Sequence, residues 1–273
     1  MLWKFLGRIR RVGLLLVPSV AGFLVADLTP AAADLLPHRV VYTLTLGSSG
    51  AVGRGDGLMS FEVKDVCDGW AMDLKAELNL ATEDGEVHRL GWSQVSWEAK
   101  DGTRYRYFSR ELTDTEETAR RRGEARRESI DAPATVTADL PQKAEFELPA
   151  GVMFPLQHTI ALIEADAAGK PYLLVNLFDG SIGDHAVELG AALSRGGKDW
   201  TQPGKDVPEL RGLHSFPVAL AFYMGESPEG LPDTEQRMRL YENGVVGQLD
   251  FAFGDINVQA RIDDFKALPP EDC

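Results

Sequence analysis

Apolar and polar residues alternate along most of this chain. Between Trp70 and Leu80 every second residue is apolar, and most of the residues between them are polar. A period of two places the two kinds of side chain on opposite faces of a β-strand, so this segment is predicted to have one buried and one wet face. The same rhythm predicts strands over residues 38–46, 58–66, 87–97, 103–112, 118–130, 172–178, 186–193, 217–223, 234–241, 245–253 and 257–265.

Turn signals separate several of these segments. Asp101-Gly102 and Asn243-Gly244 are strong hairpin turns, because such turns need residues that tolerate a positive φ. Residues 47–57 contain five glycines and are predicted to form a turn.

One segment departs from the alternation. A helix is predicted over about residues 153–168, because Leu156, Ile160 and Ile163 recur at helical spacing. Pro155 suits its first turn and Gly169 suits its end. The chain is therefore predicted to be all-β and mainly antiparallel, with one packed helix.

Many long strands with one apolar face predict a curved sheet or an open many-stranded β-barrel. Residues 34–273 are expected to form it as a single domain. The interior is either a packed core or a cleft that holds an apolar ligand, and the pattern alone leaves both open.

The N-terminus has the features of a cleavable export signal. Lys4, Arg8, Arg10 and Arg11 precede an apolar stretch, and alanines follow at 31–33. Residues 1–33 are therefore predicted to be a signal peptide that sends the chain to the periplasm of a Gram-negative cell. The adjacent arginines leave both the Sec and the twin-arginine routes open.

The composition narrows the class of partner. The whole chain carries 28 basic and 42 acidic residues, a net charge of −14. Such an acidic surface argues against nucleic acid, whose phosphates need basic surface. No later segment has the roughly 20 apolar residues of a membrane span, so no stable insertion of the mature chain is expected.

The chain has two cysteines, Cys67 and Cys273. In an oxidising compartment an isolated pair is most simply one disulfide, although two unrelated thiols remain the alternative. The bond would close a loop of roughly 200 residues. By lowering the entropy of the unfolded chain, it would stabilise the fold by roughly 5 kcal/mol.

The sequence offers no pattern that indicates an enzyme. None of the five histidines has metal-ligand spacing, and the nucleophile-elbow and phosphate-loop motifs are missing from the sequence. No catalytic residue, cofactor or metal is predicted. His158 is a possible general base, but a structural histidine near a helix start is the more common case. The arginines at 120–122, 126 and 127 are interpreted as an exposed edge or solvated strand face.

Several segments together resemble the EipB family of periplasmic cell-envelope integrity proteins in alphaproteobacteria. They are residues 36–39, 66–70, 154–158, 178–181 and 240–245, followed by Cys273. The resemblance implies a β-spiral with a helix at its side, similar in shape to the lipoprotein carriers LolA and LppX. It also implies a disulfide at Cys67 and Cys273 and a periplasmic tetratricopeptide-repeat (TPR) partner. Residues of these segments proposed as functional or structural motifs are Phe154, Pro155, Gln157, His158, Asp179, Gly180, Tyr241, Asn243 and Gly244.

The expected function is therefore maintenance of the cell envelope by binding. The bound species would be a lipid or other apolar ligand in a cleft, a TPR-repeat partner on the surface, or both. A protein-interaction scaffold with a filled core is one alternative, and a hydrolase of envelope glycans is another.

Overall fold

The computed structural model describes residues 35–46, 52–82, 86–225, 230–253, 256–271 and 273. The chain divides into two units, Met1–Ala31 and Ala32–Cys273, and all described residues belong to the second. The predicted signal peptide lies outside the described residues.

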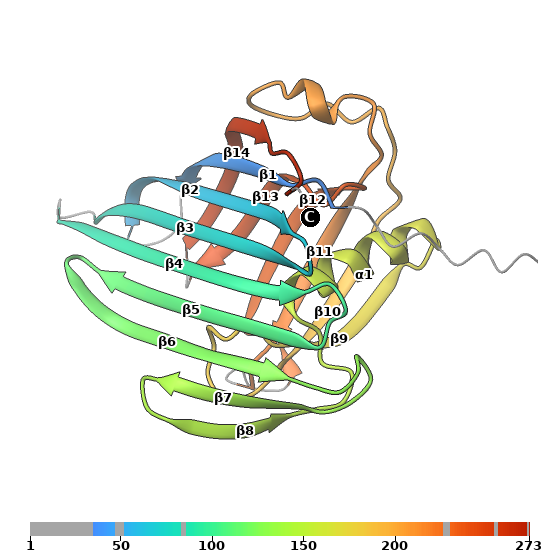
Figure 1. The fold of residues 1–273 in the computed structure, drawn as a ribbon. Helices are drawn as coiled ribbons and strands as arrows, with labels where there is room; N and C mark the ends of the chain where they lie inside the picture. The colour runs from blue at the N-terminus through green and yellow to red at the C-terminus, as the bar shows by residue number, and fades with distance from the viewer. Residues whose placement is uncertain (1–34, 47–51, 83–85, 226–229, 254–255, 272) are drawn as a thin grey trace, which may run out of the picture. The chain divides into compact units, whose positions relative to one another are not determined.

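In the described part of the chain, fourteen strands form one antiparallel sheet, and one α-helix interrupts their order (Figure 1). The first eight strands are β1 (His38–Leu46), β2 (Val52–Val66), β3 (Gly69–Thr82), β4 (Val87–Ala99), β5 (Arg104–Thr113), β6 (Glu116–Arg126), β7 (Ala134–Leu140) and β8 (Ala144–Leu148). After α1 (Pro155–Ala167) come β9 (Tyr172–Leu177), β10 (Val187–Leu193), β11 (Ser215–Tyr223), β12 (Thr234–Tyr241), β13 (Val246–Phe253) and β14 (Ile256–Ala267).

The sheet is a meander whose long connection carries the helix. Each strand from β2 to β8 pairs with the one before it, and so does each strand from β10 to β14. β14 then pairs with β1, so the two runs join into one sheet with edges at β8 and β9. The helix spans the connection between these edges. The prediction of an open antiparallel β architecture with one packed helix is confirmed.

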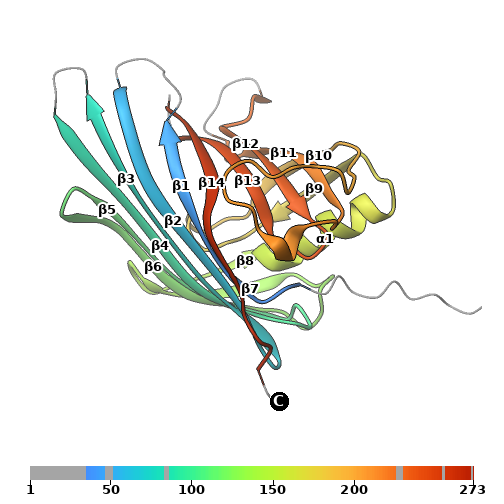
Figure 2. The ribbon, with the colours of Figure 1, turned by 90° about the horizontal axis from the view of Figure 1, so that it is seen from above.

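The helix lies within the curve of the sheet rather than beside it (Figure 2). Leu162 and Ile163 of α1 pack in one cluster with Trp70 of β3 on one side and with Leu189 and Phe216 of β10 and β11 on the other. Because both sides of the helix are covered, five of its thirteen residues are buried. In the described part of the chain, no helix has the length and apolar character needed to cross a bilayer.

The glycine-rich segment differs from its prediction. Residues 47–51 lie outside the described residues, but β2 begins at Val52, so the turn predicted over the remainder is wrong. A Cβ on Gly57 would lie 2.2 Å from the backbone oxygen of Glu77, and one on Gly55 would lie 2.8 Å from that of Asn79. These glycines therefore allow close approach between β2 and β3.

Candidate functional site

Strand β4 turns polar side chains toward the inside of the sheet. Gln94 and Glu98 are buried, whereas Val95 between them is 49% exposed. Gln94 lies opposite Leu74 of β3, and directly opposite residues share a face. Over residues 94–98 of β4 the inner face is therefore polar, whereas it is apolar at the facing residues of β3.

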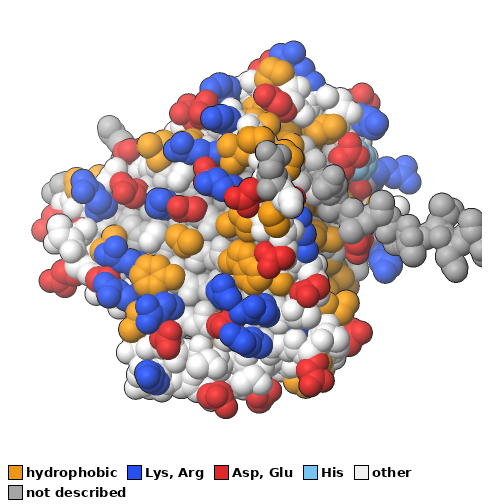
Figure 3. Space-filling view, viewed as in Figure 1, with side chains coloured by type: hydrophobic (Ala, Val, Ile, Leu, Met, Phe, Trp, Pro, Cys, Tyr) orange, Lys and Arg blue, Asp and Glu red, His pale blue; other side chains and the backbone are white. Residues whose placement is uncertain are grey.

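The reversal leaves apolar side chains on the outer face of the same strands. Val95 lies opposite Phe108 of β5. Arg106 lies 5.1 Å from the ring centroid of Trp97, which is a cation–π contact. Figure 3 shows hydrophobic side chains among Lys and Arg on this face, and Trp97, Phe108 and Arg122 line a shallow hollow of about 610 Å³ there.

Glu98 holds the start of α1. Its carboxylate oxygens accept hydrogen bonds from the backbone N–H groups of Leu156 (2.9 Å) and Gln157 (2.8 Å). The residue at the helix N-cap is Phe154, which offers no capping oxygen, so a strand supplies the acceptor that the helix end needs. Burial raises the pKa of Glu98 to about 7, against the opposing effects of the two N–H groups and of Arg127.

Arg127 is the buried cation of this cluster. Its guanidinium donates to the carbonyls of Gly102 (2.8 Å), Ile130 (3.0 Å) and Val152 (2.6 Å) and to Oε1 of Gln157 (2.7 Å). It also lies 4.7 Å from the Phe154 ring centroid. The interpretation of the arginine run as solvated is therefore wrong for Arg127, which is only 8% exposed, although it holds for exposed members such as Arg122 and Arg126.

A loop from the far edge of the sheet completes the cluster. The carbonyl of Asp179, after β9, accepts hydrogen bonds from Gln94 (2.7 Å) and from the hydroxyl of Tyr105 (2.9 Å). Gly180 has a φ of 75°, and a Cβ there would lie 2.3 Å from the Tyr107 ring. The residue must therefore be glycine for the loop to lie against β5.

The structure brings together some of the motif residues named from the sequence. Phe154, Pro155, Gln157, Asp179 and Gly180 all lie at this junction of β4, β5, α1 and the β9–β10 loop. The residues that contact them most directly, Gln94, Glu98, Tyr105 and Arg127, were not identified from the sequence.

The remaining motif residues lie elsewhere. Tyr241, Asn243 and Gly244 form the turn between β12 and β13. The carbonyl of Asn243 accepts a hydrogen bond from the backbone N–H of Leu36 (2.9 Å), and a Cβ on Gly244 would lie 2.5 Å from Leu35. This turn therefore holds the segment that leads into β1.

His158 is buried on α1, and its Nε2 has no hydrogen-bond partner among the described residues. Burial lowers its pKa to about 4. A general base usually has a partner that orients it and a pKa near the working pH. The His158 side chain has neither feature.

We expect His158→Gln to change how stability depends on pH. Between about pH 6.5 and pH 4, His158 is protonated in the unfolded wild-type chain but not in the folded chain. This residue therefore lowers the unfolding free energy as the pH falls, by about 3 kcal/mol over the whole range. Glu98 acts in the opposite sense, because its folded form keeps a proton up to about pH 7. The two effects offset each other between about pH 4.5 and 6.5.

Without His158, unfolding free energy measured by urea titration should decline steadily from about pH 5 to 7, whereas the wild type should stay nearly level to about pH 6.5. His88→Gln, at a half-exposed position on β4, is the matched control. Parallel profiles for wild type and His158→Gln would contradict the expectation.

A separate cavity of about 540 Å³ opens on the inner face of the sheet, away from α1. Its apolar lining is Leu44, Met59, Leu74, Ala76, Leu78, Leu90, Trp92, Leu112, Leu249 and Phe251. Several of these side chains, including Ala76 and Trp92, are only half-buried, because they face the cavity rather than packed atoms. The interior is thus filled around α1 and hollow beyond it.

The cavity also has polar lining. Glu111 and Thr113 of β5, Thr118 of β6 and Gln236 of β12 contribute to it. Glu111 forms an ion pair with Arg121 at 3.1 Å.

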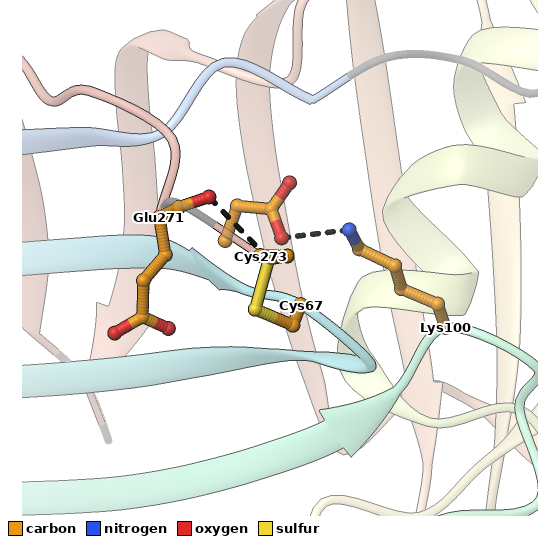
Figure 4. The surroundings of a disulfide bond; sticks show 5 residues. Cys67, Lys100, Glu271 and Cys273 are labelled. Carbon is orange, nitrogen blue, oxygen red and sulfur yellow. Dashed lines mark hydrogen bonds and ion pairs between the residues drawn. A yellow bond between two sulfur atoms is a disulfide. The ribbon is translucent and has the colours of Figure 1, made fainter.

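The disulfide joins Cys67, in the turn between β2 and β3, to Cys273 (Figure 4). Their Cα atoms are 5.7 Å apart across a sequence separation of 206 residues. The bond links the end of β2 to the segment that follows β14, and β1 lies between these two strands in the sheet. The predicted pairing of these two cysteines is therefore present.

Comparison with known proteins agrees with this architecture. The chain is 27% identical over 255 residues to the cell envelope integrity protein EipB of Brucella abortus (strain 2308), covering 89% of this chain and 88% of that protein. The crystal structure of a beta-barrel-like protein of domain of unknown function DUF1849 from Brucella abortus shares the fold, with a TM-score of 0.80 and 22% identity over 87% of this chain and 100% of that one. The family model described as EipB-like matches residues 29–269. Because this match spans most of the sequence, the chain belongs to the EipB-like family.

Proposed function

We propose that this protein maintains the cell envelope from the periplasm by holding the apolar chain of a lipid-like ligand in the inner cavity. The observation that carries the proposal is the cavity of about 540 Å³ with a largely apolar lining. Its size falls within the range of small-molecule sites, which are typically about 300–1,000 Å³.

Burial of an acyl chain in this cavity is favourable. Each CH₂ group removed from water contributes about 0.8 kcal/mol, so several groups offset the cost of immobilising the ligand. The walls are strands of one continuous sheet, so the site is largely formed before a ligand arrives.

The periplasmic location is supported by the sequence and by the family. Residues 1–33 have the charge and hydropathy pattern of an export signal. The Cys67–Cys273 bond suits an oxidising compartment. The relative from Brucella abortus is named as a cell envelope integrity protein.

We expect Ala76→Phe to reduce lipid co-purification strongly. Ala76 lines the cavity and lies opposite Met59 and Trp92, so a phenyl ring there would occupy the space between them. Native mass spectrometry of protein from a periplasmic preparation should show an acyl-lipid mass on the wild type that organic solvent removes. The bound fraction should fall at least roughly tenfold in the variant, as expected when the apolar contact is lost.

Glu77→Phe is the matched control, because Glu77 is the exposed neighbour on the outer face of β3. It adds the same ring without entering the cavity and should retain the lipid. A wild type that stays free of ligand, both as isolated and after exposure to lipid, would refute the proposal.

A scaffold that docks a periplasmic helical-repeat protein, such as a TPR protein, is the second candidate. The outward-facing Val95, Trp97 and Phe108 favour it, because partly exposed aromatic groups beside arginine are typical of protein interfaces. The same variant separates the two candidates. Ala76→Phe protein that binds no lipid but still supports envelope integrity would favour the scaffold.

A further inference from the structure

We propose that the cavity selects an amphiphile with an uncharged, hydroxyl-bearing head group, and that it discriminates against phosphate and carboxylate heads. This inference rests on the proposed function, because it names the class of ligand for the same cavity. It is carried by the polar groups of the lining and by the balance of their charges.

Three neutral polar side chains of the lining are available to a ligand. Among the described residues, none forms a hydrogen bond with the side chain of Thr113, Thr118 or Gln236. Hydroxyl and amide groups both donate and accept hydrogen bonds, so they match the hydroxyl groups of a glycerol or a sugar.

The charges of the lining oppose an anionic head. Glu111 is the one charged residue among those that line the cavity in the described part of the chain, and its partner is Arg121 of the protein itself. A phosphate or carboxylate head group would therefore lose its hydration next to the Glu111 carboxylate. No unpaired cation of the lining would compensate for that loss. The net charge of −14 acts in the same direction.

A buried hydroxyl next to the cavity wall is a second observation. Ser109 lies on the same face of β5 as Glu111, two residues away and opposite Arg121. It is 1% exposed, and its Oγ has no hydrogen-bond partner among the described residues. An unpaired buried hydroxyl is costly, so a polar head that reaches past Glu111 would gain by pairing with it.

The test compares ligands that share a twelve-carbon chain and differ in the head group. Monolauroylglycerol, dodecanoate, dodecyl phosphate and dodecylammonium are titrated below their micelle-forming concentrations into the delipidated mature protein. Trp92 lines the cavity, so its fluorescence reports occupancy, and Trp92→Phe shows which part of the signal comes from this site. We expect monolauroylglycerol to bind at least roughly tenfold more tightly than dodecyl phosphate or dodecanoate.

Variants assign the selectivity to the polar lining. Thr118→Val combined with Gln236→Leu keeps the approximate size of both side chains and removes their hydrogen-bonding groups, so monolauroylglycerol should lose its advantage while the chain still binds. Thr137→Val, at an exposed position on β7, is the matched control and should keep the wild-type order.

The possible failures are distinguishable. If none of the four compounds binds, the proposed function fails with this inference. If all four bind with equal affinity, or if the phosphate or carboxylate binds most tightly, the inference is overturned and the proposed function stands. Tightest binding of dodecylammonium would also overturn it, because Glu111 would then be the recognition group.

Discussion

Arg127→Ala is expected to destabilise the fold by about 3–5 kcal/mol, the usual cost of removing one partner from a buried charge cluster. The substitution leaves the carbonyls of Gly102, Ile130 and Val152 without their donor. It also leaves the buried Glu98 without a nearby cation, and so raises the cost of its charge. Urea titration of the unfolding free energy at neutral pH measures the change.

Arg126→Ala provides the comparison, because Arg126 is the preceding residue with the same chemistry in a different setting. Its side chain is 63% exposed and pairs with Glu124, which also pairs with Arg104 and Arg106. Exposed ion pairs contribute about 0–1 kcal/mol, so this variant should differ little from the wild type. Equal losses in the two variants would show that the Arg127 cluster does not stabilise the fold.

The contrast between these arginines shows what the sequence could predict. Alternation identified most of the strands, because successive side chains of a strand point to opposite faces, one exposed to water and one buried. The segments at 38–46 and 234–241 coincide with β1 and β12. Within 118–130, however, the pattern could not separate Arg126 from Arg127, because the strand ends between them and the chain then turns the guanidinium inward.

Two strands were missed because their buried face is small. In β7 the inward residues are Ala134, Val136 and Ala138. Alanine contributes little to an apolar pattern, so the alternation was too weak to notice. β8 is only five residues long and has a single buried residue, Leu148.

The polar cluster depends on contacts that sequence spacing does not encode. Glu98 and Leu156 are 58 residues apart, and Gln94 and Asp179 are 85 apart. In the sequence alone, a polar residue that faces inward on β4 cannot be distinguished from one that faces outward. The signal is that polar residues of β4 pair with apolar residues of β3, and it can be recognised only when the register of the two strands is known.

The alternation of apolar and polar residues also could not show whether the interior is a cavity or a packed core. The inward residues of β3 are apolar from Trp70 to Leu80, yet Trp70 and Met72 pack against α1 while Ala76 faces open space. The difference is set by the length of the helix, which fills only one part of the curve.

Cys67→Ser is expected to destabilise the oxidised protein by about 5 kcal/mol, because the bond closes a loop of 206 residues and so restricts the unfolded chain. For a domain of this size, such a loss should lower the melting temperature by roughly 10–20 °C. The β1–β14 and β1–β2 ladders do not include the bond, so the variant should keep the same far-ultraviolet circular dichroism. Thermal melts of the wild type and the variant measure the effect, once mass spectrometry has verified that the wild type is oxidised.

The double variant Cys67→Ser/Cys273→Ser separates loss of the bond from the effect of a stray thiol. If the cross-link is the cause, the double variant, the single variant and the reduced wild type should all have the same melting temperature. The loss should also appear mainly as an entropy difference of the unfolded state rather than as a change in the folded sheet. If oxidised wild type and the double variant melt within about 2 °C of each other, the bond contributes too little for the chain-entropy argument to hold.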